Sequence, residues 1–98
     1  VTLSRPEGLE RSVHEMSLAL EICRITEGEV GRDALPRVQE VGIVVGHDSG
    51  VEPDSLVFCM EALLSHPPFC GARLNMELCD GDDLRVSYLE IEDDDTAN

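Results

Sequence analysis

Residues 14–20 read HEMSLAL, a histidine–glutamate pair followed at once by a mainly apolar run. Apolar side chains then recur every three or four positions, with Leu18, Ile22 and Ile25 at the spacing of one helix face. The face is widened by the neighbouring apolar residues Met16, Ala19, Leu20 and Cys23. This pattern predicts an amphipathic helix over residues 14–29 with a wide apolar face. Imidazole nitrogen and carboxylate oxygen are both ligands of first-row metals, so the pair at the helix start is also a candidate metal site.

A second apolar segment, residues 37–46 (RVQEVGIVVG), alternates along its length and is rich in β-branched residues. This alternation predicts a strand covered by helices. Pro53, with an acidic residue on either side, is typical of a first helical position, and the apolar stripe after it predicts a second helix. Pro67 and Pro68 are expected to end that helix.

Two further strands are predicted later in the chain. Residues 72–78 alternate apolar and polar side chains, as a half-buried strand does. Residues 84–92 form a third strand, whose apolar phase slips between Val86 and Leu89 and so indicates a β-bulge. Residues 80–83 (DGDD) are typical of a hairpin turn. The order α-β-α-β-β predicts an α+β fold, a two-layer sandwich with two helices packed on one face of a small three-stranded sheet.

The composition limits the size, the partners and the location of the protein. Its 98 residues suit one small domain, which we place at residues 13–92, after a flexible leader (1–12) and before an acidic, disordered tail (93–98). The formal net charge of −14 argues against nucleic acid and anionic membranes as partners and concentrates cations, although it also serves solubility alone. No signal-peptide pattern and no apolar run of ~20 residues is present, so a cytoplasmic protein is expected.

Other residues that suggest chemistry have simpler explanations. No Gly-rich phosphate loop, nucleophile elbow or spaced triad is present, so the chain is not expected to be an enzyme. The 4 cysteines show no C-x-x-C spacing and indicate no zinc cluster. His47 suits an exposed turn, and His66 suits the end of a helix, where the dipole favours a cation. Cys70 has no basic neighbour in the sequence and is assigned no role.

Four motifs, in order, resemble one known family. They are residues 14–19 (HEMSLA), 46–58 (GHDSGVEPDSLVF), 71–74 (GARL) and 81–92 (GDDLRVSYLEIE). Together they resemble the HypA/HybF nickel metallochaperones of hydrogenase maturation, which implies a nickel-binding domain and Ni(II) as the metal. Members of that family ordinarily carry a zinc-binding domain with paired C-x-x-C motifs between the last two strands. This chain has only Cys79 and a short turn there, so zinc is not expected.

By this resemblance, nickel is held near the start of the family domain. A histidine beside a free terminal amine offers the amine, its own amide nitrogen and its imidazole to square-planar Ni(II). His14 is then the principal ligand, Glu15 contributes its backbone nitrogen or its carboxylate, and Glu52 is a candidate outer carboxylate. Because Val13 precedes His14, either translation begins at Val13, read as methionine, or nickel is bound through side chains alone; the resemblance favours the first. Without the family, all three residues are ordinary charged or solvated groups at helix starts.

The resemblance implies a chaperone that assists nickel insertion into a [NiFe]-hydrogenase precursor by ligand exchange. It also implies two partners, a maturation GTPase and the hydrogenase large-subunit precursor, while homodimer formation stays open. The alternative is a zinc-less adaptor that keeps the protein-binding surface and no longer delivers metal. Binding of the GTPase that ignores a chelator favours the adaptor, and metal-dependent binding favours the chaperone.

Overall fold

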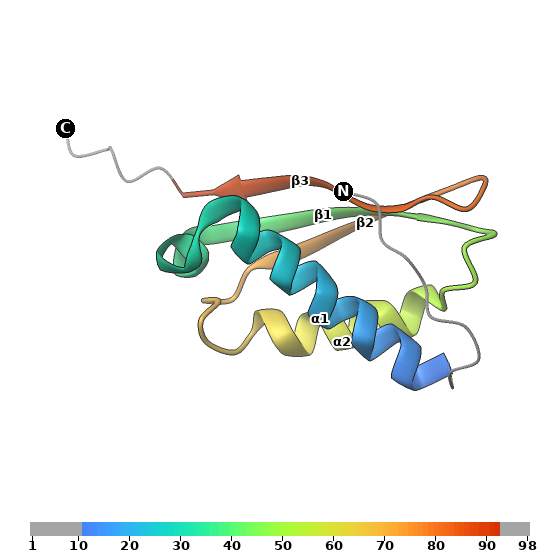
Figure 1. Ribbon diagram of the computed structural model, residues 1–98, viewed down its shortest axis with the longest axis horizontal. Coiled ribbons are helices and arrows are strands. Elements are labelled where there is room, and N and C mark those ends of the chain that lie inside the picture. Colours follow the sequence, from blue (N-terminus) through green and yellow to red (C-terminus); the bar gives the residue numbers. More distant parts are fainter. Residues whose placement is uncertain (1–10, 93–98) are drawn as a thin grey trace.

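The computed structural model describes residues 11–92, and it has the predicted order of elements with one short 3-10 helix added (Figure 1). The elements are α1 (Arg11–Val30), η1 (Arg32–Arg37), β1 (Val38–Gly46), α2 (Pro53–Leu64), β2 (Arg73–Cys79) and β3 (Leu84–Ile91). Both long helices lie on one face of the three-stranded sheet, which confirms the α+β two-layer prediction. Helix α1 begins at Arg11, inside the predicted leader. The rest of that leader, residues 1–10, and the predicted acidic tail, residues 93–98, lie outside the described residues.

The sheet has the strand order β2-β1-β3, so β1 is its central strand. It pairs in parallel with β2, which follows the α2 crossover, and antiparallel with β3. The prediction of a hairpin at residues 80–83 is therefore wrong, because β2 and β3 lie on opposite sides of β1. The connecting loop instead crosses the end of β1, where the Gly46 amide donates to the Asp83 carbonyl at 2.6 Å and the Asp48 amide donates to the Gly81 carbonyl at 2.7 Å. An Asp-Gly turn suits such a loop as well as a hairpin, so turn chemistry alone could not decide the pairing.

The predicted bulge in the third strand is confirmed. Gly42 of β1 pairs with Tyr88 and the next residue, Ile43, pairs with Val86, so Ser87 is the additional residue in β3. The bulge returns the apolar side chains to the helix side and leaves Tyr88 on the open face of the sheet. There the tyrosine ring covers Gly42, whose missing Cβ would lie 2.2 Å from the Tyr88 Cε2 atom.

The core lies between the two layers and is almost entirely aliphatic. Its buried members are Leu18, Ala19, Ile22, Leu35, Val38, Val41, Ile43, Val45, Val51, Leu56, Cys59, Met60, Leu64, Phe69 and Leu84. The predicted helix face is confirmed at Leu18 and Ile22, whereas Met16 and Leu20, also expected on it, are exposed. The buried stripe of α1 is narrower than predicted, and it includes two polar residues, Glu15 and Thr26. No helix within residues 11–92 is long and apolar enough to cross a membrane.

Candidate metal centre

A buried glutamate joins the starts of the two helices. Glu15 is the fifth residue of α1 and is 0% exposed. Its Oε2 atom accepts a hydrogen bond of 2.8 Å from the backbone amide of Glu52, 37 residues away. Glu52 is the N-cap residue of α2 and makes no capping bond with its own side chain. In a capping box, the side chain of the third helical residue accepts a hydrogen bond from the N-cap amide. In α2 the third helical residue is Ser55, and Glu15 of α1 accepts this bond instead.

This arrangement places a carboxylate at the N-terminus of α2, where the helix dipole stabilises negative charge. The other carboxylate oxygen, Oε1, is buried and has no hydrogen-bond partner among the described residues. Cys59 lies in the same region: burial raises the pKa of its thiol, and the charge of Glu15 raises it further. The Glu15 side chain is thus enclosed by protein, with one oxygen committed to Glu52.

The structure brings together two of the three residues predicted to bind nickel. Glu15 contacts the Glu52 backbone directly, and the Glu52 side chain is half-buried. His14 precedes Glu15 in α1, but its side chain lies outside the part of the chain that the structure describes. Among the described side chains, no group of three His, Cys, Asp or Glu residues is placed to hold a metal ion.

His14 is the fourth residue of α1, and its backbone is helical. The Glu15 amide has the Arg11 carbonyl as its i−4 acceptor in the same helix. The two backbone nitrogen atoms predicted to bind nickel therefore lie within a helical segment.

The other residues considered from the sequence take the simpler places predicted for them. His47 and Asp48 are exposed in the turn after β1. His66 is exposed just beyond α2, with its Nδ1 atom 2.7 Å from the Ala62 carbonyl oxygen, so it satisfies an end carbonyl of the helix. Burial raises the pKa of the Cys23 thiol to about 11, which makes it a poor nucleophile and a poor metal ligand.

Sequence reasoning missed a polar cluster on the open face of the sheet. The Tyr88 hydroxyl donates to Glu40, the Asn75 amide donates to the Tyr88 hydroxyl at 2.6 Å, and the Arg73 Nε donates to Glu40 at 3.0 Å. The bond from Tyr88 lowers the pKa of Glu40 most, and the bond from Arg73 lowers it further. The bond to Glu40 raises the pKa of Tyr88. The cluster draws on all three strands, so only the strand order could have revealed it.

Comparisons with known proteins support the family named by the motifs. A family profile described as "Hydrogenase/urease nickel incorporation, metallochaperone, hypA" matches residues 13–83. Hydrogenase maturation factor HypA of Chlorobaculum parvum is 37% identical over 68 residues, covering 69% of this chain and 60% of that protein. The HypA of Albidiferax ferrireducens is 38% identical over 64 residues, covering 65% and 57%. This chain therefore spans about three fifths of the length of the relatives it matches.

A solved structure shares the fold. The solution structure of the Ni metallochaperone HypA from Helicobacter pylori aligns with a TM-score of 0.65 at 12% sequence identity, covering 80% of this chain and 97% of that chain. At this identity the likeness shows the fold alone. The family names describe metallochaperones and not enzymes, in agreement with the sequence. Because the profile spans residues 13–83, the larger part of the 98 residues, this chain belongs to the HypA family of nickel-incorporation metallochaperones.

Proposed function

We propose that this chain binds Ni(II) as cargo at the paired helix starts and assists nickel insertion during [NiFe]-hydrogenase maturation. One observation carries this proposal: the bond between Glu15 and the Glu52 amide, 2.8 Å, brings the predicted nickel residues to one end of the helical layer. The family profile includes all three of them. The net charge of −14 attracts cations to the protein as a whole.

The local geometry favours particular donors. His14 supplies its imidazole and its amide nitrogen, which are ligands that suit square-planar Ni(II). The Glu15 carboxylate is buried and bonded to Glu52, so the backbone nitrogen is the better donor from this residue. Glu52 is the outer carboxylate. In a chain that begins at residue 13, the Arg11 carbonyl is absent, and the Glu15 amide is released from its helical bond.

Delivery requires partners that lie beyond the residues described here. We assign this role to a maturation GTPase and the hydrogenase large-subunit precursor, in the cytoplasm, with nickel passing by ligand exchange. A square-planar donor set leaves the two axial positions of the ion open, which suits transfer by ligand exchange. Zinc is not part of the proposal. Residues 80–83 join β2 directly to β3, and the one thiol beside them is that of Cys79, the last residue of β2. One thiolate does not make a tetrahedral zinc site.

The test is a nickel titration followed by calorimetry and by visible absorption. Three proteins are compared: the 98-residue chain, a chain that begins at residue 13 with methionine, and its His14→Ala variant. His47→Ala in the shorter chain is the matched control, because His47 lies in an exposed turn. We expect one-to-one binding with a square-planar spectrum in the shorter chain, retained in the control and lost in His14→Ala. Absence of specific nickel binding in both wild-type forms would refute the proposal.

The adaptor function is the second candidate, and an exposed apolar surface on the helices favours it. Phe58 of α2 is 73% exposed, the largest exposed fraction among the large apolar side chains of residues 15–92. A pull-down with the maturation GTPase, in nickel and in a chelator, separates the two functions. Capture that is equal in both conditions supports the adaptor, whereas capture that requires nickel supports the chaperone.

A further inference from the structure

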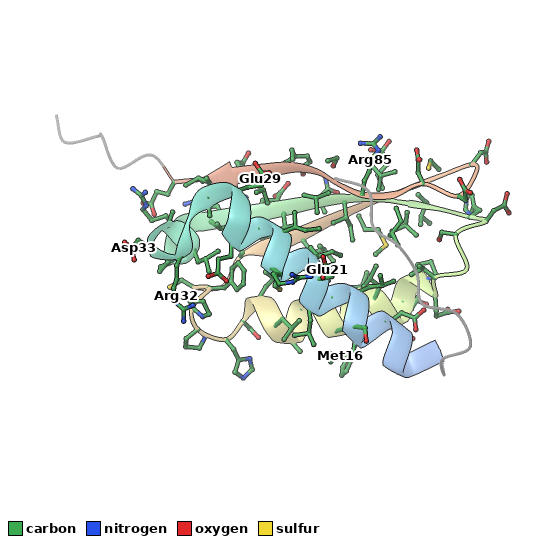
Figure 2. All side chains as sticks on the ribbon, viewed as in Figure 1. Met16, Glu21, Glu29, Arg32, Asp33 and Arg85 are labelled. Carbon is green, nitrogen blue, oxygen red and sulfur yellow. The ribbon has the colours of Figure 1, made fainter. Side chains whose placement is uncertain are left out.

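Among the described side chains of the two long helices, three large apolar ones are exposed. Met16 and Leu20, one turn apart on α1, are 37% and 53% exposed, and Phe58 on α2 is 73% exposed. Figure 2 shows Met16 beside α1 on the side away from the strands. We call Met16, Leu20 and Phe58 the outer helix face. None of the three belongs to the buried core or packs against it.

The outer helix face contains two hollows. One, of 420 Å³, lies between Met16 and Phe58 and reaches Cys59. The other, of 400 Å³, begins at Leu20 and reaches Leu35 and Phe69 of the core. Because Met16 and Leu20 are on successive turns of α1, the two hollows follow each other along the helix. Apolar anchors spaced by one helical turn are the pattern that an amphipathic helix presents to a groove.

Most charges around this face are negative, although Arg24 also lines the second hollow. Asp54 lines the first hollow and Glu21 lines the second, while Glu61 is exposed on α2. Between residues 15 and 30 and throughout α2, Arg24 is the only basic residue, and it is paired with Glu21. A second copy of this chain would therefore bring acidic groups against acidic groups, at a total charge of −14 on each copy.

We propose that the outer helix face is a docking site for an amphipathic helical segment of another protein, with apolar anchors and flanking Lys or Arg residues. The apolar anchors fill the two hollows, and the basic residues face the acids around them. This proposal does not require nickel, because none of its residues is a proposed nickel donor. The face nevertheless adjoins the nickel end, since Met16 follows Glu15 and Asp54 lies two residues after Glu52. A docked segment would thus lie next to the cargo.

The test uses a designed probe. The probe is an 18-residue amphipathic helical peptide of Leu and Lys with one Trp, and it is titrated into the 98-residue chain in EDTA at 150 mM NaCl. The chain has no tryptophan, so the fluorescence reports the peptide alone. The variant is Phe58→Ser, and the matched control is Leu78→Ser, because Leu78 is 48% exposed on β2. Thermal unfolding checks that both variants are folded.

We expect saturable one-to-one binding that Phe58→Ser weakens by at least about tenfold, as for the central residue of an interface. Leu78→Ser should change the affinity by less than about twofold, and a Leu/Glu peptide should not bind. Equal effects of the two substitutions, equal binding of the Leu/Glu peptide, or no binding at all would each overturn the proposal. So would a wild-type dimer in sedimentation that Phe58→Ser converts to monomer, since the occupant would then be a second copy. The assay contains a chelator, so its result is independent of the nickel titration.

Discussion

The contact between Glu15 and Glu52 leads to a prediction in which a substitution changes the free energy of unfolding little but changes the exchange rate of one amide strongly. Replacement of Glu15 by Leu removes the bond of 2.8 Å to the Glu52 amide and also removes the buried Oε1 atom, which has no partner among the described residues. A hydrogen bond to a charged group contributes about 1.5–3 kcal/mol, and an unpaired buried polar atom costs about 1–3 kcal/mol. The two terms nearly cancel.

Glu15→Leu is therefore expected to unfold within about 1 kcal/mol of the wild type, because leucine is of similar size and leaves no buried unpaired oxygen. Glu15→Ala loses the bond and also leaves a cavity, so it should cost about 2–4 kcal/mol, or a Tm lower by about 10–25 °C for a domain of this size. Glu15→Gln keeps an acceptor and the shape, and it should cost about 1 kcal/mol. Glu21→Gln, on the outer side of the same helix, is the control.

Hydrogen exchange reports the local effect. Loss of a bond of about 1.5–3 kcal/mol should raise the exchange rate of the Glu52 amide by about 10- to 100-fold in the Leu and Ala variants, and far less in Glu15→Gln. Urea unfolding and amide exchange by NMR would measure the two quantities on the same samples. If Glu15→Leu left the Glu52 amide as protected as in the wild type, the bond would not be what holds the two helix starts together, and the reasoning would fail.

Two further predictions concern the sheet. Gly46→Ala should lower the free energy of unfolding in urea by about 1 kcal/mol or more beyond the effect of Gly42→Ala. A Cβ at Gly46 would lie 2.3 Å from the backbone oxygen of Gly81, which cannot move aside easily. A Cβ at Gly42 would meet the ring of Tyr88, which can shift. Tyr88→Phe should lower stability at pH 7, and the difference should shrink as the pH falls below 4.5, the ordinary pKa of Glu40. The bond from Tyr88 lowers the pKa of Glu40 in the folded protein, so it stabilises the fold above the pKa that Glu40 has in the unfolded chain. This stabilisation is lost as Glu40 becomes protonated. Equal stability differences between Tyr88→Phe and the wild type at pH 7 and pH 3 would contradict this.

The fold was predictable where local patterns determine it. The spacing of Leu18 and Ile22 predicted α1, the alternation in residues 37–46 predicted β1, and the phase slip between Val86 and Leu89 predicted the bulge at Ser87. Strand order was not predictable in this way, because pairing depends on contacts between distant segments. The DGDD turn has the same local chemistry in a hairpin and in a loop across the end of β1.

At the candidate site, the sequence predicted His14, Glu15 and Glu52 as nickel ligands but did not predict how Glu15 and Glu52 contact each other. Glu15 was considered as a metal ligand at a helix start, yet it lies four positions before Ala19 and seven before Ile22, on the buried stripe of α1. That spacing was a signal that its side chain points inward. The partner of Glu15 could not be found from the sequence, because a backbone amide 37 residues away leaves no pattern.

The short distance along the chain between Glu15 and Met16 gives the two proposals a physical connection. Glu15 holds the start of α1 against α2 from the inside, and Met16 belongs to the outer helix face on the other side of the same turn. If a segment docks beside Met16 and displaces this turn, the positions of the His14 and Glu15 nitrogen atoms relative to each other change. Coupling between two binding sites is reciprocal, so a partner that weakens nickel binding by a given factor must itself be bound more weakly, by the same factor, when nickel is present. Such coupling would favour release of the cargo on docking, and the empty chaperone would then bind the partner more tightly than the loaded one does.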